Sequence, residues 1–478
     1  MTPELQQVAA RRRANVLTAL ILAGLGGLAT LGWHYGRDPL SLALAVALAL
    51  LCALPLIRFQ RRPDRIPTIP ALAGVYAIYY SLPVFLRPEL TVKLEPLDPH
   101  AIQTALWGAL VGWIAIALGT AVPLPRFLRG SFAGSAPSPR RSWVFGVILV
   151  ALYLCVDPFV DSAPSAIRHV LAVLHLGGPV GFFLLARADV SKAGIPRALR
   201  VLAWLALFPL SLVSGIARGL LFPALLLGLG ALLGRWRRSG RIPWALVAAS
   251  AAALVVLQSA KMTFRDLTWG GHLENLDVFS KAELFARLAV TSVGQQNDST
   301  EAAKERTDAL TTLAYVMDHT PFPVPFWNGE SYSTAAWVLV PRMFYPLKPV
   351  AVLGGEFGHR YDLLDYSDQT TSYNFPQLVE AYANFGWPGI VLIMFAIGML
   401  YGIAERLFNN RTAGVGGEIL TMVCLLGFVA MEGDTAGMLG GVVQAVIVYW
   451  PIARVISGWS FRANEDSKLR LGLPHPEV

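Results

Sequence analysis

Residues 40–57 read LSLALAVALALLCALPLI, an apolar run without a charged side chain between Asp38 and Arg58. An α-helix rises about 1.5 Å per residue, so such a run is long enough to cross the roughly 30 Å hydrocarbon layer of a membrane. Comparable apolar runs recur from one end of the chain to the other. They predict an all-α polytopic membrane protein.

The composition excludes an ordinary soluble enzyme. Of the 478 residues, 55% are hydrophobic and 15% are charged, and the mean hydropathy is +0.52, whereas soluble domains carry about 25% charged residues. The three cysteines, Cys52, Cys155 and Cys424, all fall inside apolar runs. They provide no spacing suited to a metal site or to an external disulfide.

Hydropathy predicts about twelve transmembrane helices. They lie near residues 16–34, 40–57, 67–86, 102–122, 143–160, 169–186, 200–217, 219–234, 243–260, 387–405, 415–431 and 435–453. This places helices 1–9 in residues 1–260, a long external segment at 261–385, helices 10–12 in 386–454 and a cytoplasmic tail at 455–478. A connection as long as 261–385 is far too long for a simple loop.

Basic residues divide unevenly between the two sides of the membrane. One set of short loops and tails holds Arg58, Arg61, Arg62, Arg65, Arg126, Arg129, Arg140, Arg141, Arg187, Lys192, Arg197, Arg200, Arg235, Arg237, Arg238, Arg241, Arg406, Arg411 and Arg454; the opposite loops hold only Arg37, Arg87, Lys93, Arg168 and Arg218. The positive-inside rule therefore predicts that both termini are cytoplasmic. The asymmetry also accounts for the net charge of +8 without a nucleic-acid partner.

Two helices and an irregular stretch are predicted within the external segment. The first helix covers residues 281–293, and Asp298 with Glu301 predicts the capped start of a second one that ends near His319. The apolar positions of the second helix share a face with Arg306, which is typical either of a helix lying on the membrane surface or of an ordinary packed helix. Residues 321–375 are rich in proline, glycine and aromatic residues, as in an ordered loop that lines a site.

Cationic residues at the outer boundary are the main candidates for binding. Arg218 lies in a hairpin too short to bury it and sits at the outer mouth, where it either contacts a ligand or snorkels as a helix anchor. Arg265 follows the ninth predicted helix, one turn after Lys261. Arg342 and Lys348 are flanked by prolines at 341, 346 and 349, which present them on a stiff segment. Several arginines with few carboxylates suit a diphosphate, because guanidinium groups pair bidentately with phosphoryl oxygens.

The remaining candidates are a proton acceptor and aromatic platforms. His359 is a candidate base, because histidine is the side chain most often used for proton transfer, and Glu380 is the alternative. Tyr332 belongs to a set of aromatic residues that either support sugar rings or form an interfacial belt. The sequence has no phosphate-binding glycine loop, no nucleophile elbow and no zinc-binding helix motif, so we expect neither a metal nor a cofactor.

The order of these features resembles the Wzy-type polymerases of bacterial O-antigen, capsule and exopolysaccharide pathways. The resemblance rests on the Arg218-Gly219 hairpin, Arg265, the Gly329 to Tyr332 segment, the Pro341 to Pro349 string and the segment from Glu380 to Gly389. It covers roughly residues 200–405 by motif and the rest by topology. The related O-antigen ligases are similar in layout and remain an alternative.

The resemblance implies a fold of the glycosyltransferase type C kind in the bacterial inner membrane. It implies a metal-independent enzyme that joins undecaprenyl-diphosphate-linked oligosaccharides at the external face. Arg218, Arg265, Arg306, Arg342, Lys348 and Tyr332 would then bind the donor's diphosphate and glycan, and His359 or Glu380 would accept the proton. Membrane lipid, a chain-length regulator and a flippase of the same pathway are the implied partners. A flippase or transporter is a further alternative, although the two halves of the chain do not match as transporter repeats do.

Overall fold

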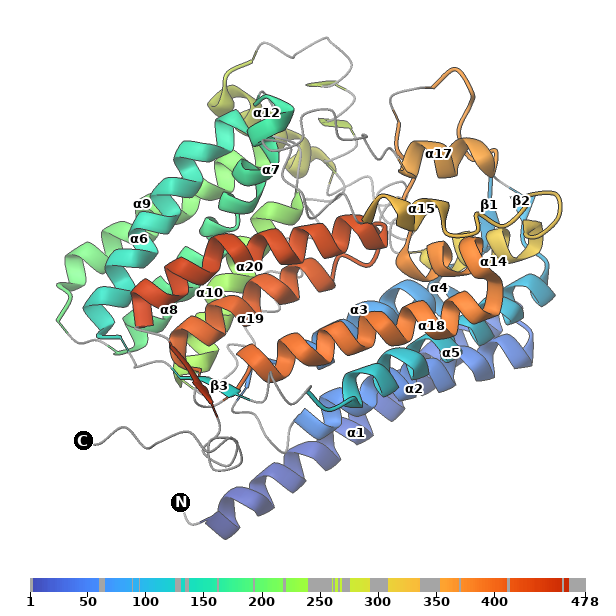
Figure 1. The fold of residues 1–478 in the computed structure, drawn as a ribbon, viewed down its shortest axis with the longest axis horizontal. Helices are drawn as coiled ribbons and strands as arrows, with labels where there is room; N and C mark the ends of the chain where they lie inside the picture. Colours follow the sequence, from blue (N-terminus) through green and yellow to red (C-terminus); the bar gives the residue numbers. More distant parts are fainter. Residues whose placement is uncertain are drawn as a thin grey trace. The chain divides into compact units, whose positions relative to one another are not determined.

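The computed structural model is built from helices and two short antiparallel ribbons (Figure 1). It describes residues 3–59, 65–87, 89–93, 95–124, 130–133, 137–160, 163–191, 194–217, 221–239, 260, 263–264, 267–268, 276–292, 308–335, 353–368, 371–410, 413–457 and 460–463. The chain divides into two compact units. Unit 1 comprises residues 1–134, 306–446 and 459–478, and unit 2 comprises residues 135–305 and 447–458.

Eight described helices are long and apolar enough to cross a membrane, which confirms an all-α membrane protein. The candidate spans are Ala14–His34, Pro39–Phe59, Pro99–Ala121, Pro139–Phe159, Leu171–Val190, Arg197–Ile216, Gln377–Phe408 and Thr435–Ser457. Two further predicted spans coincide with the shorter apolar helices Thr68–Tyr80 and Gly414–Phe428. Helix α10 (Leu221–Ser239) covers the span predicted near 219–234, and nearly all of the span predicted at 243–260 lies outside the described residues.

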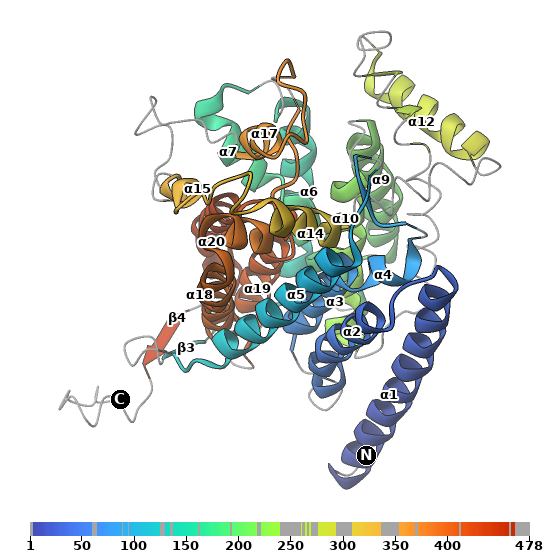
Figure 2. The same cartoon turned by 90° about the vertical axis from the view of Figure 1, so that its right-hand side faces the viewer.

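Unit 1 is organised around the pair α5 and α18. Its elements are α1 (Pro3–His34), α2 (Pro39–Phe59), α3 (Thr68–Tyr80), α4 (Leu82–Leu86), β1 (Thr91–Val92), β2 (Glu95–Pro96), α5 (Pro99–Ala121), β3 (Gly130–Ala133), α14 (Ala309–His319), α15 (Glu330–Ser333), α17 (Leu353–Arg360), α18 (Gln377–Phe408), α19 (Gly414–Phe428), the start of α20 (Thr435–Ser457) and β4 (Ser460–Ala463). Helix α18 packs most extensively on α5, with α14 and α19 against it. Helix α1 lies at the outside of this unit, next to α2 and α4 (Figure 2).

Glycines let α5 and α18 approach each other closely. A Cβ atom on Gly119 would lie 2.2 Å from the carbonyl oxygen of Phe395, and one on Gly398 would lie 2.2 Å from that of Ile116. Gly402, one turn after Gly398, faces the backbone of Thr120. Small residues at such positions allow backbone contact between membrane helices, where lipid gives no hydrophobic drive for association.

Helix α18 is interrupted near its start. Gly386 has φ 63° and ψ −144°, a conformation outside the helical region that residues with a Cβ rarely adopt. Pro388 follows at the beginning of the continuing helix, a position where the missing N–H of proline is tolerated. The segment before Gly386 is therefore a separate short helix of nine residues, from Gln377 to Phe385.

Unit 2 is a bundle built on close helix contacts of the same kind. It contains α6 (Pro139–Val156), η2 (Asp157–Phe159), α7 (Ser165–Leu174), α8 (Gly177–Ser191), α9 (Arg197–Ala217), α10 (Leu221–Ser239), α12 (Val278–Ser292) and the end of α20. Helix α8 packs against both α6 and α10. A Cβ on Gly230 of α10 would lie 2.1 Å from the carbonyl oxygen of Pro179, and one on Gly234 would lie 2.1 Å from that of Phe183.

The two helices predicted in the external segment have different outcomes. Helix α12 confirms the first. The second begins later than predicted, because the Asp308 side chain accepts a hydrogen bond from the Thr311 N–H and caps α14 at Ala309. The predicted cap at Asp298 lies outside the described residues. Leu310, Leu313 and Val316 are completely buried, so the apolar face of α14 packs inside unit 1, as in an ordinary packed helix.

A buried ion pair fastens the start of α14 to the rest of unit 1. Arg87, at the end of α4, pairs with the Asp308 carboxylate, and both side chains are almost fully buried. Arg37 donates a hydrogen bond of 2.9 Å to the carbonyl oxygen of Arg87. Burial raises the pKa of Asp308, against the opposing effect of the Arg87 charge. Breaking such a pair by removing one partner is costly, because it leaves a buried charge uncompensated.

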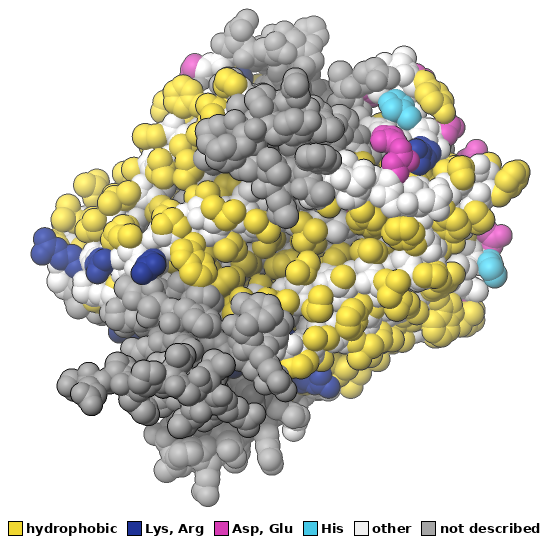
Figure 3. Space-filling view, in the orientation of Figure 1, with side chains coloured by type: hydrophobic (Ala, Val, Ile, Leu, Met, Phe, Trp, Pro, Cys, Tyr) yellow, Lys and Arg dark blue, Asp and Glu magenta, His cyan; other side chains and the backbone are white. Residues whose placement is uncertain are grey.

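The exposed surface of the long helices in unit 1 is apolar. Trp107, Ile114 and Leu118 project from α5, and Val391 and Leu392 project from α18. Figure 3 shows hydrophobic side chains along these helices, and acidic, basic and histidine side chains gathered near α15 and α17. Contiguous exposed apolar surface of this kind is typical of contact with lipid.

We predict that Gly230→Ala destabilises the protein by about 1–3 kcal/mol, the usual cost of overpacking. The new methyl group would collide with the backbone of α8, which cannot move aside as a flexible side chain can. Thermal unfolding of the purified protein in detergent measures the effect. Gly228→Ala is the matched control, because nothing lies within 4 Å of its Cβ position. Equal midpoints for the two variants would contradict the glycine contact.

Candidate functional site

Glu380 is the centre of a buried polar network at the start of α18. Its Oε1 accepts a hydrogen bond of 2.6 Å from the Ser331 hydroxyl, and its Oε2 accepts one of 2.7 Å from the backbone N–H of Thr435. Thr435 is the first residue of α20, where unpaired N–H groups and the helix dipole favour an anion. Glu380 and Ser331 are 0% exposed. The carboxylate thus ties α15 and α20 to α18.

Asn384, one turn after Glu380, completes the network. Its Nδ2 donates to the Ser331 hydroxyl at 2.9 Å, and its Oδ1 accepts from the backbone N–H of Gly329 at 2.9 Å. The backbone N–H groups of Trp327 and Asn328 donate to the carbonyl oxygens of Ala383 and Asn384. Residues 327–331 are therefore held against α18 by main-chain and side-chain hydrogen bonds. Gly329 has φ 90°, which allows this turn before α15.

Tyr332 lies over the same region. Its ring is stacked on that of Phe385, with centroids 6.0 Å apart and planes inclined by 11°. Burial, reinforced by the negative charge of Glu380, raises the pKa of Tyr332. Its hydroxyl and that of Thr435 are both buried and interact with each other beside the Glu380 carboxylate.

Arg360 forms the charged part of the site. Its guanidinium lies 4.0 Å from the centroid of the Trp327 ring, a cation–π contact. It donates to Glu330 at 2.9 Å and to Glu356 at 3.2 Å. The three charged side chains sum to −1, so this cluster repels a phosphate. The guanidinium and the two carboxylates are partly exposed and can instead hydrogen-bond a neutral sugar, while the buried Trp327 ring holds the guanidinium in place.

His359 is next to Arg360 but faces other groups. Its ring stacks on that of Tyr366, with centroids 5.7 Å apart. Its Nδ1 is buried and has no hydrogen-bond partner among the residues described. Tyr366 is 71% exposed, so this pair lies at the surface of the protein. Hydrogen bonds from Ser367 lower the pKa of the neighbouring Asp365.

The structure thus places three of the predicted site residues. Tyr332, His359 and Glu380 all lie in unit 1, but Glu380 contacts neither His359 nor Tyr366 through a hydrogen bond in the described part of the chain. The five predicted cationic residues, Arg218, Arg265, Arg306, Arg342 and Lys348, lie outside the described residues.

Sequence reasoning missed Arg360 and gave Ser331 no role. The signal for Arg360 was the spacing of Glu356 and Arg360, four residues apart as in a helical ion pair. The contact of Arg360 with Trp327 joins residues from separate segments of the chain, so no local pattern reports it. For Ser331, only its three-dimensional neighbours reveal that its hydroxyl connects Glu380 with Asn384.

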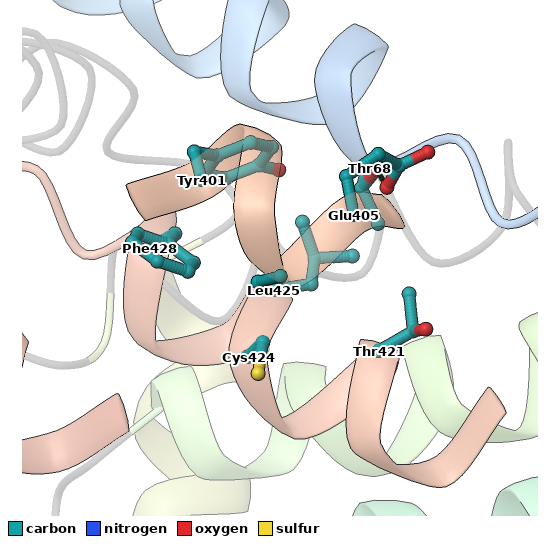
Figure 4. A pocket seen from close by; sticks show the side chains of 8 residues that line it. Thr68, Tyr401, Glu405, Thr421, Cys424, Leu425 and Phe428 are labelled. Atoms are coloured by element: carbon teal, nitrogen blue, oxygen red, sulfur yellow. Dashed lines mark hydrogen bonds between the residues drawn. The ribbon is translucent and has the colours of Figure 1, made fainter. Parts of the chain in front are cut away.

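A second polar cluster lies near the other end of α18, beyond the break at Gly386. Thr68 and Asn409 donate hydrogen bonds to the Glu405 carboxylate. Beside it is a cavity of about 10 Å³, lined also by Tyr401 and Thr421 (Figure 4). Their hydroxyls have no hydrogen-bond partner within the described part of the chain, and the volume suits one water molecule. No group of three His, Cys, Asp or Glu side chains in the described ranges is placed to hold a metal ion.

We predict that Glu380→Gln lowers the free energy of unfolding by about 1–3 kcal/mol. The amide presents an NH2 group either to the Thr435 N–H or to the Ser331 hydroxyl, so a buried donor loses its acceptor. Thermal unfolding in detergent checks this. The control is Glu283→Gln, an exposed carboxylate on α12 whose partner is the exposed Arg287. If the thermal midpoint of Glu380→Gln were as high as that of the control, the hydrogen bonds of Glu380 would not be stabilising the segment 327–331.

Comparison with known proteins identifies a family but no activity. No curated protein and no solved structure gives a significant match to the chain. Residues 114–426, more than half of the chain, match a family described as a domain of unknown function (DUF8712). The matched region includes α6 to α18, the 327–335 segment and Glu380. The chain therefore belongs to the DUF8712 family.

Proposed function

We propose that the protein is a membrane glycosyltransferase that joins polyprenyl-diphosphate-linked oligosaccharides. The reaction would take place at the external face of a bacterial inner membrane, with both termini in the cytoplasm. The growing glycan would pass from its lipid carrier to a hydroxyl group of the incoming lipid-linked unit. The fold would be of the glycosyltransferase type C kind, and the chain would use neither a metal nor a nucleotide sugar.

The observation that carries this proposal is the anchoring of residues 327–332 on α18. A buried carboxylate and a buried amide, Glu380 and Asn384, fix the turn that bears Trp327, Glu330 and Tyr332. Enzymes hold binding groups on rigid supports because small displacements are costly in rate. In this proposal Glu380 is a positioning residue. The exposed carboxylates of Glu330 and Glu356, with Arg360 between them, then receive a sugar.

The Arg360 cluster and the predicted cationic residues differ in net charge, so we assign them to different parts of the substrate. The Arg360 cluster carries a net negative charge, so it suits the neutral part of the glycan. The diphosphate requires cations, and Arg218, Arg265, Arg342, Lys348 and Arg306 are proposed for it. Cleavage of the glycosyl–phosphate bond leaves charge on the leaving diphosphate, and fixed cations stabilise that charge more in the transition state than in the ground state.

Deletion of the gene in its host, followed by gel analysis of lipid-linked and surface glycans, tests the function. We expect the deletion strain to retain single repeat units while surface attachment persists. Complementation with Arg218→Ala should leave the same pattern, because the diphosphate loses a cation. Arg287→Ala is the control, since Arg287 is exposed and pairs with Glu283 on the same helix; it should restore long chains.

Two other patterns would overturn the polymerase. Full-length polymer that remains on its lipid carrier would identify a ligase. Single units trapped on the cytoplasmic leaflet would identify a flippase. Long chains in the strain complemented with Arg218→Ala would show that the reaction does not need Arg218. That result would not contradict the polymerase function.

A further inference from the structure

Three residues from separate helices of unit 2 form a compact polar cluster. Asp157 is the first residue of η2, directly after α6; His175 follows α7; and Ser214 lies in the last turn of α9. His175 Nε2 contacts one carboxylate oxygen of Asp157, and the Ser214 hydroxyl donates to the other. By the predicted topology, Asp157 and Ser214 lie near the external ends of their spans, and His175 lies within the external half of the span predicted at 169–186.

The surroundings of the cluster are apolar and tightly packed. Asp157 is 2% exposed. The ring of Tyr153 lies against the His175 ring, with centroids 4.4 Å apart, and Val150, Tyr153, Phe182 and Leu185 form a buried core nearby. Ile216, two residues after Ser214, packs against the Phe264 and Phe285 cluster. A carboxylate in such surroundings is expensive unless it is paired, and ionisable residues within membrane spans are functional candidates by default.

Among the described residues, the imidazole is held through one of its two nitrogens. His175 Nε2 faces Asp157, whereas Nδ1 makes no hydrogen bond within the described ranges. The side chain is 15% exposed, so the ring is not sealed in the core. A carboxylate on one ring nitrogen fixes the tautomer and the orientation of a histidine, and it stabilises the imidazolium that forms when the other nitrogen takes a proton. Ser214 in turn orients the carboxylate.

We propose that His175, oriented by Asp157 and Ser214, is the group that accepts the proton of the acceptor sugar hydroxyl. This inference rests on the proposed function. The acceptor oxygen forms a bond to the anomeric carbon of the donor while its proton moves to His175 Nδ1. The bond between that carbon and the diphosphate oxygen breaks, and the lipid diphosphate leaves with the electron pair. Asp157 and Ser214 are positioning residues, because they act only through the imidazole.

The chain order supports this assignment. Ser214 is four residues before Arg218, the strongest sequence candidate for the diphosphate. Helix α9 ends at Ala217, immediately before Arg218. Helix α9 therefore carries Ser214, which orients the proposed proton acceptor, in its last turn. It ends directly before Arg218, the proposed phosphate ligand. His359, the base predicted from sequence, has no carboxylate partner of this kind among the described residues.

Steady-state kinetics of the purified full-length protein test the inference, with the lipid-linked repeat unit accumulated by the deletion strain as substrate. We expect His175→Ala to lower kcat at least 100-fold, as for loss of a general base, while KM stays within about 3-fold of wild type. Added imidazole should restore part of the rate. Asp157→Asn should lower kcat about 10-fold or more. Its thermal midpoint is measured as a control for folding. His359→Gln is the comparison variant and should retain more activity than His175→Gln.

Each outcome separates the inference from the proposed function. Wild-type protein that does not extend the lipid-linked unit overturns the proposed function, and the inference falls with it. Active wild-type protein together with an undiminished kcat for His175→Gln overturns the inference alone. A loss of rate in His175→Ala that accompanies a lowered thermal midpoint and is not rescued by imidazole assigns a structural role and also overturns it.

Discussion

Backbone contact at glycine is the constraint on which both units depend. In unit 1, Gly119, Gly398 and Gly402 bring α5 against α18, and this contact fixes the helix that carries Glu380 and Asn384. In unit 2, Gly230 and Gly234 set α10 against α8 in the same way. Helices in lipid gain little from burying apolar side chains against one another. Close backbone contact at the glycines therefore determines where the polar ends of these helices lie.

Buried polar groups then specify the segments between helices. Asp308 starts α14 and pairs with Arg87, and Glu380 receives donors from α15 and α20. Each carboxylate is satisfied by partners distant in sequence, so each helps to select one arrangement of the chain. The same principle holds for Asp157 in unit 2. Its two oxygens join the ends of three helical segments.

The sequence predicts the spans well because length and hydropathy are local properties. It predicts α12 for the same reason. The helix that ends at His319 begins at Ala309 rather than near residue 298, because the buried Asp308 caps it and pairs with Arg87, a residue distant in sequence. The Arg360 cluster and the Asp157–His175–Ser214 cluster were missed because their members come from separate segments. Tyr332, His359 and Glu380 stay predictions from residue type and position, and only the fold shows which residues they contact.

The break at Gly386 separates Glu380 from the part of α18 that is long enough to span a membrane. The helix that continues from Trp387 to Phe408 has 22 residues and rises about 33 Å, enough to cross the hydrocarbon layer by itself. The nine residues before the break are then free to run along the membrane boundary rather than through it. Glu380 and Asn384 would then hold residues 327–331 at the water-facing edge of the protein rather than within the hydrocarbon layer.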